Sequence, residues 1–331
     1  MSLSKAGTAL RCNRAATFAA LTLFVSVFCQ SAFSQQLSPQ RDAFFKRLMV
    51  GGAEKGKIYV ELPLKPTFFA GAKTPQDRRA AWDAFFARVL RERSDDGRAG
   101  PVGYWGGSAY QDVDWSSVAD AVEVRIGDVL GVRTSTAEGS AKVVRYAIHY
   151  NVPSDANLLL AVAEPLAGFK VTQSDFLIAA AGLSRCGSRC MARKQTPDTQ
   201  TLARIRKAVS LGAKTPKVLQ IKEIIAFEGR FTRPASQYVV YVSFGTDSPS
   251  NLVGYWRTAI LDTDLSTIAI IGENEYGHIR PRSVGDVDGD GLDEVWVNLG
   301  GYEGGNAGLM YWRGGSGSDS FRIIESAYNG A

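Results

Sequence analysis

Five carboxylates and two glycines occupy the nine positions 286–294, which read Asp-Val-Asp-Gly-Asp-Gly-Leu-Asp-Glu. Carboxylates at the first, third and fifth positions can converge on one hard cation only where the backbone turns sharply, and glycine at the sixth position permits that turn. Gly291 occupies the sixth position. A bare turn rarely needs three acids at alternating positions, because their charges repel one another. The segment therefore predicts a Ca²⁺ loop.

The residues after this loop exclude an EF-hand. An EF-hand needs a bidentate glutamate at the twelfth position, at the start of a second helix. Here that position is Val297, inside a strand-like apolar run. A nine-residue acidic loop that leads into β-branched and aromatic residues resembles the calcium loops of FG-GAP and VCBS-type repeats, as found in integrin-like β-propeller blades. The resemblance covers residue 277 to about residue 312.

By that pattern the acid that closes the loop is Glu294, and Asp293 is a flanking acid, although two adjacent acids leave either able to close it. The expected metal site combines carboxylates with the backbone carbonyl of the seventh position: Asp286, Asp288, Asp290, Leu292 and Glu294, with Asp293 beside them. The chain holds no second complete copy of the loop. We therefore expect one or two blade-like units rather than a whole propeller.

The N-terminal residues have the pattern of an export signal. Lys5, Arg11 and Arg14 precede an apolar stretch over residues 15–28, and Ala32-Phe33-Ser34 offers small residues at the two positions that a signal peptidase reads. The apolar stretch is shorter than the roughly 20 residues of a membrane span. We expect residues 1–34 to be a cleaved signal peptide, which gives a periplasmic or secreted protein with no stable membrane span.

Removal of residues 1–34 changes both the charge and the cysteine content. The formal charge falls from +5 to +2, and no basic stripe or aromatic ladder remains to suggest nucleic-acid binding. Cys186 and Cys190 are left as the only cysteine pair. An even count in an exported chain favours a disulfide between them. Two cysteines without nearby histidines make a poor zinc site.

Hydrophobic periodicity divides the mature chain into two parts. The first part predicts a short helix from Ser38 that ends at Gly51 and Gly52, a helix that Thr74 caps, a hairpin over residues 141–163, and a helix that ends at Gly212. Beyond residue 217 the chain alternates short strands and turns, as in an antiparallel meander. The fold class is therefore α+β, with an α+β domain over residues 35–215 and a β-rich domain over residues 216–331.

Motifs for catalysis are absent from the sequence: it has no Gly-x-Ser-x-Gly elbow, no His-Glu-x-x-His and no phosphate-binding glycine loop. We expect an exported, calcium-stabilised binding or structural module without catalysis of its own, whose partner is a protein or a cell-envelope glycan. The alternative is a secreted hydrolase of glycosides or cell-wall polymers. It would use Glu303, in a glycine-rich segment, beside a groove of aromatic residues: Trp256, Trp296, Tyr302 and Trp312.

Overall fold

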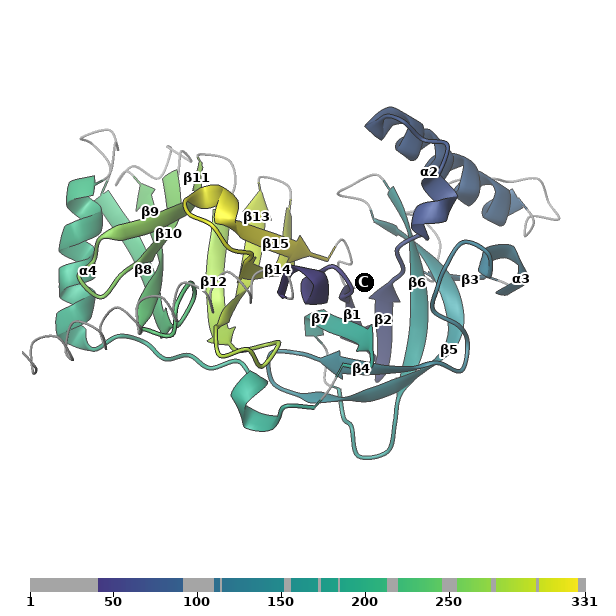
Figure 1. Cartoon of the computed structure of the whole chain (residues 1–331), viewed down its shortest axis with the longest axis horizontal. Helices are drawn as coiled ribbons and strands as arrows, with labels where there is room; N and C mark the ends of the chain where they lie inside the picture. The colour runs from purple at the N-terminus through teal and green to yellow at the C-terminus, as the bar shows by residue number, and fades with distance from the viewer. Residues whose placement is uncertain are drawn as a thin grey trace, which may run out of the picture.

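The computed structural model describes ten stretches of the chain: residues 41–91, 110–113, 115–151, 156–171, 174–183, 185–212, 220–245, 255–274, 278–301 and 304–326. Residues 1–40 lie outside them, so the signal peptide and the export that it implies stay predictions. No helix within the described stretches is long and apolar enough to cross a membrane. The expected α+β class is confirmed, with helices placed around three antiparallel sheets (Figure 1).

The N-terminal sheet closes into a barrel, which the sequence did not predict. Its strands pair in the order β5-β4-β7-β1-β2-β6, and β6 then pairs with β5 again to complete the ring. β3 pairs with the far half of β5, beyond β4. The seven strands are β1 (Met49–Glu54), β2 (Lys57–Glu61), β3 (Tyr110–Val113), β4 (Val129–Arg133), β5 (Glu138–Asn151), β6 (Ala156–Pro165) and β7 (Ser174–Ala181).

Alternating side chains fill the barrel, because successive residues of a strand point to opposite faces. On β6, Leu159, Ala161 and Ala163 join the barrel core, whereas Leu160 and Val162 pack on the other face. The predicted hairpin over residues 141–163 is confirmed as β5 and β6, whose register runs from Ala141 opposite Pro165 to Asn151 opposite Ala156. Burial on both faces explains why β6 has an uninterrupted apolar sequence.

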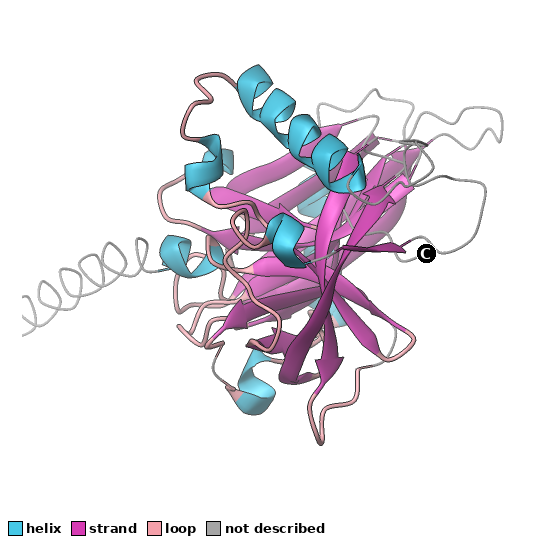
Figure 2. Cartoon of the chain, turned by 90° about the vertical axis from the view of Figure 1, so that its right-hand side faces the viewer, coloured by secondary structure: helices cyan, strands magenta, loops and turns pink. Residues whose placement is uncertain are grey.

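Helix α2 (Pro75–Arg91) lies across one side of the barrel (Figures 1 and 2). Its start is capped as predicted: the Thr74 hydroxyl accepts the Asp77 N–H at 3.1 Å, and the Asp77 carboxylate accepts the Thr74 N–H at 2.8 Å. Phe85, Phe86 and Val89 are buried in the barrel core. The aromatic stripe of this helix is therefore a packing surface.

The prediction of a short helix that ends at Gly51 and Gly52 is wrong for the second half of that segment. A helical turn covers residues 41–45, and the chain then enters β1. A Cβ atom on Gly51 would lie 1.8 Å from the carbonyl oxygen of Tyr59 on β2, so the close approach of the two strands requires glycine here. The glycines that the sequence analysis took for a helix end are thus part of the barrel wall.

The C-terminal part consists of two four-stranded antiparallel meanders, each in chain order. The meander predicted beyond residue 217 is confirmed. The first contains β8 (Gln220–Gly229), β9 (Gln237–Gly245), β10 (Tyr255–Leu261) and β11 (Thr267–Asn274). The second contains β12 (His278–Gly285), β13 (Glu294–Gly301), β14 (Gly304–Trp312) and β15 (Phe321–Glu325). Apolar side chains from both meanders, among them Val239, Ile260, Val295 and Met310, share one core.

Helix α4 (Thr199–Gly212) ends at the predicted glycine and covers the outer face of the first meander. Ile205 and Val209 pack there against Val240, Val242 and Leu261. The described residues also include four very short helices: η1 (Pro66–Phe69), α3 (Trp115–Val118), η2 (Gly187–Cys190) and η3 (Ser318–Ser320).

A separate apolar cluster joins the barrel to the second meander. Phe176 and Ile178 of β7 contact Trp296 and Leu309 of the meander, and the Phe176 and Trp296 rings meet edge to face with centroids 5.5 Å apart. The helical turn at residues 41–45 adds Phe45, whose ring stacks on Tyr311 at 4.0 Å. The acidic loop, which connects β12 to β13, lies beside this joint.

Candidate metal centre

Two glycines in the left-handed region shape the acidic loop. Gly289 has φ 79° and Gly291 has φ 93°, values that side-chain-bearing residues rarely adopt. The turn expected at Gly291 is therefore present. It folds residues 286–293 back on themselves, so that the chain leaves β12 at Gly285 and enters β13 at Glu294, and these two residues are register partners.

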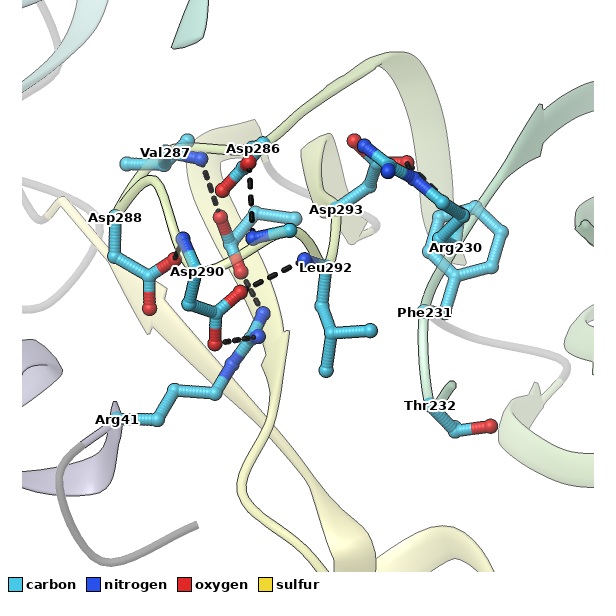
Figure 3. Close-up of polar contacts among 12 residues, drawn as sticks. Arg41, Arg230, Phe231, Thr232, Asp286, Val287, Asp288, Asp290, Leu292 and Asp293 are labelled. Atoms are coloured by element: carbon cyan, nitrogen blue, oxygen red, sulfur yellow. Dashed lines mark hydrogen bonds and ion pairs between the residues drawn. The ribbon is translucent and has the colours of Figure 1, made fainter. Parts of the chain in front are cut away.

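Three of the predicted ligands come together. One carboxylate oxygen from each of Asp286, Asp288 and Glu294 lies within 4.8 Å of the others, which is close enough to hold a single cation. Loop N–H groups orient them: Gly291 donates to Asp286 at 3.0 Å, Asp290 to Asp288 at 3.2 Å, and Val287 to Glu294 at 2.6 Å (Figure 3). The donor atoms are all oxygens, which suits a hard cation such as Ca²⁺ or Mg²⁺.

Asp286 has a buried carboxylate oxygen that a cation could bind. Its residue is 6% exposed, and its Oδ1 atom is buried without a hydrogen-bond partner in the described part of the chain. A buried acceptor of this kind costs free energy unless a donor or a cation satisfies it. A metal ion between the three carboxylates would supply that partner.

The electrostatics of the loop also favour a cation. Burial raises the pKa of the Asp286 carboxyl, and repulsion from Asp290 raises it further. Burial raises the pKa of Asp288 to about 7, with Asp290 adding to the effect and Arg41 opposing it. In both groups, burial and neighbouring carboxylates disfavour the ionised form. A divalent ion would favour their ionised forms.

Asp290, the expected fifth-position ligand, is bound to a guanidinium instead. Arg41 Nη1 lies 2.6 Å from Asp290 Oδ2, and Arg41 Nη2 donates to Glu294 Oε1 (Figure 3). The other Asp290 oxygen accepts the N–H of Leu292 at 2.8 Å. The Arg41 side chain is 1% exposed, so this is a buried ion pair with two loop carboxylates.

Asp293 faces away from the three carboxylates, whereas the backbone carbonyl of Leu292, the expected seventh-position ligand, stays a prediction. The Asp293 carboxylate accepts the N–H of Arg230 at 2.8 Å (Figure 3). It also accepts a hydrogen bond from the Arg193 guanidinium at 2.7 Å. The Leu292 side chain is 4% exposed and packs in the core between the meanders. Of the two adjacent acids, Glu294 is thus the one placed with Asp286 and Asp288, whereas Asp293 ties the loop to β8 and to the segment that follows the cysteines.

Arg133, at the end of barrel strand β4, supports the loop from the other side. Its side chain is 2% exposed, donates from Nη1 to the carbonyl oxygen of Val287, and lies 3.0 Å from Glu138. Sequence analysis identified neither Arg41 nor Arg133. They lie 253 and 154 residues from their loop partners, and nothing in their local sequences indicates those contacts.

The predicted Cys186–Cys190 disulfide is present, with Cα atoms 5.8 Å apart. Glu138 accepts the N–H groups of Cys186 at 3.3 Å and of Gly187 at 2.7 Å. The same carboxylate pairs with Arg133, so the disulfide turn and the acidic loop are linked through two side chains. The bonded pair has no role as a metal ligand.

The aromatic groove of the hydrolase hypothesis is not formed as expected. Trp296 is 4% exposed in the joint with the barrel, and Trp312 is 8% exposed in the core between the meanders. Trp256 lines a cleft of about 570 Å³, which is also lined by Glu273, His278 and Glu325. Glu303 and Tyr302 lie outside the described residues.

In comparisons with known proteins, no family model, no curated protein and no solved structure matches the chain.

Proposed function

We propose that the chain is an exported, calcium-stabilised binding or structural module without catalysis of its own, and that its acidic loop is an FG-GAP or VCBS-type Ca²⁺ site. The observation that carries this proposal is the group of Asp286, Asp288 and Glu294, with a buried oxygen that has no partner in the described structure. Extracellular calcium modules of modest affinity, with dissociation constants of roughly 10⁻⁴–10⁻³ M, use donors of the same type.

Two further features fit this proposal. The disulfide between Cys186 and Cys190 suits an oxidising compartment such as the periplasm or the medium. The loop contacts the barrel through Arg133 and the first meander through Asp293. A cation in the loop would therefore hold the barrel and the two meanders together, and its binding free energy would become stability. Such a frame would present its surface to a protein or a cell-envelope glycan.

Thermal unfolding tests the metal site. In 5 mM CaCl₂ we expect the melting temperature of the wild-type chain to exceed that in chelator by about 5 °C, since ligand at many times its dissociation constant adds about 2 kcal/mol. Asp288→Asn should remove most of this rise because it deletes one charged ligand. The measurement is scanning calorimetry with and without calcium, repeated with magnesium.

A matched control comes from the turn between β10 and β11. Asp264 is an exposed acid there that accepts hydrogen bonds from Ser266 and lies outside the metal group, so Asp264→Asn should keep the full calcium response. A wild-type melting temperature that ignores calcium, or an Asp288→Asn variant that responds like the wild type, would disprove the site.

A secreted hydrolase is the second candidate, because Trp256, Glu273 and Glu325 line one cleft between the meanders. Aromatic faces suit sugar rings, and two carboxylates suffice for glycoside hydrolysis. Hydrolysis of cell-wall glycan by the wild type that Glu325→Gln abolishes would establish this candidate. Hydrolysis that the substitution leaves unchanged would point to a contaminating enzyme.

A further inference from the structure

The guanidinium of Arg41 lies where calcium would need ligands. Calcium takes six to eight oxygens, and the loop is expected to offer them from its first, third, fifth and closing acids. Every carboxylate oxygen of Asp290 and Glu294 already accepts a donor: Arg41 takes one from each, and the N–H groups of Leu292 and Val287 take the others. Only Asp286 and Asp288 retain oxygens without a donor among the described residues.

Arg41 also belongs to a segment with its own anchorage. The turn at residues 41–45 is held by Phe45, which is 2% exposed and stacks on Tyr311, and by Asp42, which accepts the Tyr311 hydroxyl at 3.2 Å. The Arg41 guanidinium lies 5.7 Å from the Phe45 ring centroid. The same turn therefore carries both the Arg41 contacts with the acidic loop and the contacts with Tyr311 of β14. Figure 3 shows the Arg41 guanidinium beside the loop carboxylates.

We propose that Arg41 is a built-in competitor of calcium, so that metal binding at the loop and docking of residues 41–48 oppose each other. A metal ion that recruits Asp290 and Glu294 would place its two positive charges beside the guanidinium, and these like charges repel one another within the same buried site. Metal binding therefore favours release of the guanidinium. Displacement removes the Arg41 ion pairs and leaves the segment held by the Phe45 stack and the Asp42–Tyr311 hydrogen bond. This inference rests on the proposed calcium site and assigns it a consequence: calcium loosens the N-terminal segment.

The competition sets the apparent calcium affinity. Linkage requires that if a docked Arg41 weakens calcium binding by some factor, calcium weakens docking by the same factor. Coupling between two such sites is typically about 5- to 150-fold. Removing the guanidinium should therefore tighten calcium binding by a factor in this range, whereas removing another arginine of the same segment should not.

Calcium titration calorimetry on the mature chain tests the proposal with two variants. Arg41→Met keeps an apolar stem against Phe45 but removes the charge, and it should bind calcium at least 5-fold more tightly than the wild type. Arg47 is exposed and lies later in the same segment, so Arg47→Met should match the wild type. Equal affinities in Arg41→Met and the wild type would overturn the competition and leave the calcium site standing. Absence of calcium binding in all three proteins would overturn both.

Hydrogen exchange of the wild type provides a second measurement that needs no variant to fold. Calcium should increase the exchange rate of the amides of residues 42–48, because docking and metal binding oppose each other. Magnesium, which binds fewer protein oxygens and retains water, should do so less. Slower exchange of these amides in calcium would show that Arg41 and the metal bind together, and would overturn the proposal.

Discussion

Replacing Trp296 with alanine is expected to lower the free energy of unfolding by about 3–5 kcal/mol, as for other large aromatic residues removed from cores. The side chain is 4% exposed and fills the joint between β7 and the second meander, where it meets Phe176 edge to face. The cavity left by alanine would open in the cluster that also contains Val287 of the acidic loop, so the calcium response should weaken as well. Urea denaturation followed by circular dichroism gives the first quantity.

Trp296→Phe is the matched control. The indole Nε1 atom is buried without a hydrogen-bond partner in the described structure, so phenylalanine loses no hydrogen bond and retains a ring against Phe176. We expect a loss of less than about 1.5 kcal/mol. If alanine left stability intact and instead abolished binding of a glycan, Trp296 would be a ligand-binding residue, and its assignment to the joint would be wrong.

Replacing Arg133 with methionine is expected to cost about 3–5 kcal/mol, the range for removal of one partner from a buried ion pair. The substitution removes the donor of the Val287 carbonyl oxygen and the cationic partner of Glu138, which keeps only the N–H groups of Cys186 and Gly187. The loop would lose its attachment to the barrel, and calcium binding should weaken. Urea denaturation and calcium titration of the same samples measure the two effects.

A surface pair provides the comparison. Arg79 and Asp83 on α2 form an i,i+4 pair at 3.5 Å in which both side chains are 62% exposed. Arg79→Met should change stability by no more than about 0.5 kcal/mol. Arg133→Lys, which keeps the charge but loses the planar fork, should fall between the two. A loss for Arg133→Met as small as that for Arg79→Met would mean that the barrel does not support the loop.

Local signals predicted the parts of the molecule that depend on neighbours in sequence. The α2 helix follows from Thr74, Asp77 and the aromatic spacing, and the β5–β6 hairpin follows from two apolar runs around a turn. The metal group was predicted for the same reason, because Asp286, Asp288 and Glu294 are held by hydrogen bonds within the loop. Each of these features depends on contacts between residues that are close in sequence.

The barrel and the arginines depend on distant partners, which the sequence does not reveal. β1 reads Met-Val-Gly-Gly-Ala-Glu, with no alternation, and its glycines became informative only when Gly51 was seen against Tyr59. β7, its other partner, lies more than 120 residues later. Likewise, Asp290 was predicted to be a metal ligand from its position in the loop, and nothing near it in the sequence indicated that Arg41 would bind its carboxylate. Long-range pairing therefore determined what sequence analysis missed.

The position of Arg41 in the chain has a consequence for the order of folding. All strands of the barrel precede residue 182, so the ring can close before the second meander has been synthesised. Glu294 lies 253 positions after Arg41, and contacts of such long range form slowly. In a chain that emerges N-terminus first, Arg41 can therefore form its ion pair only after Glu294 has been synthesised. The Arg41 contact thus distinguishes a completely folded chain from one in which only the barrel has formed.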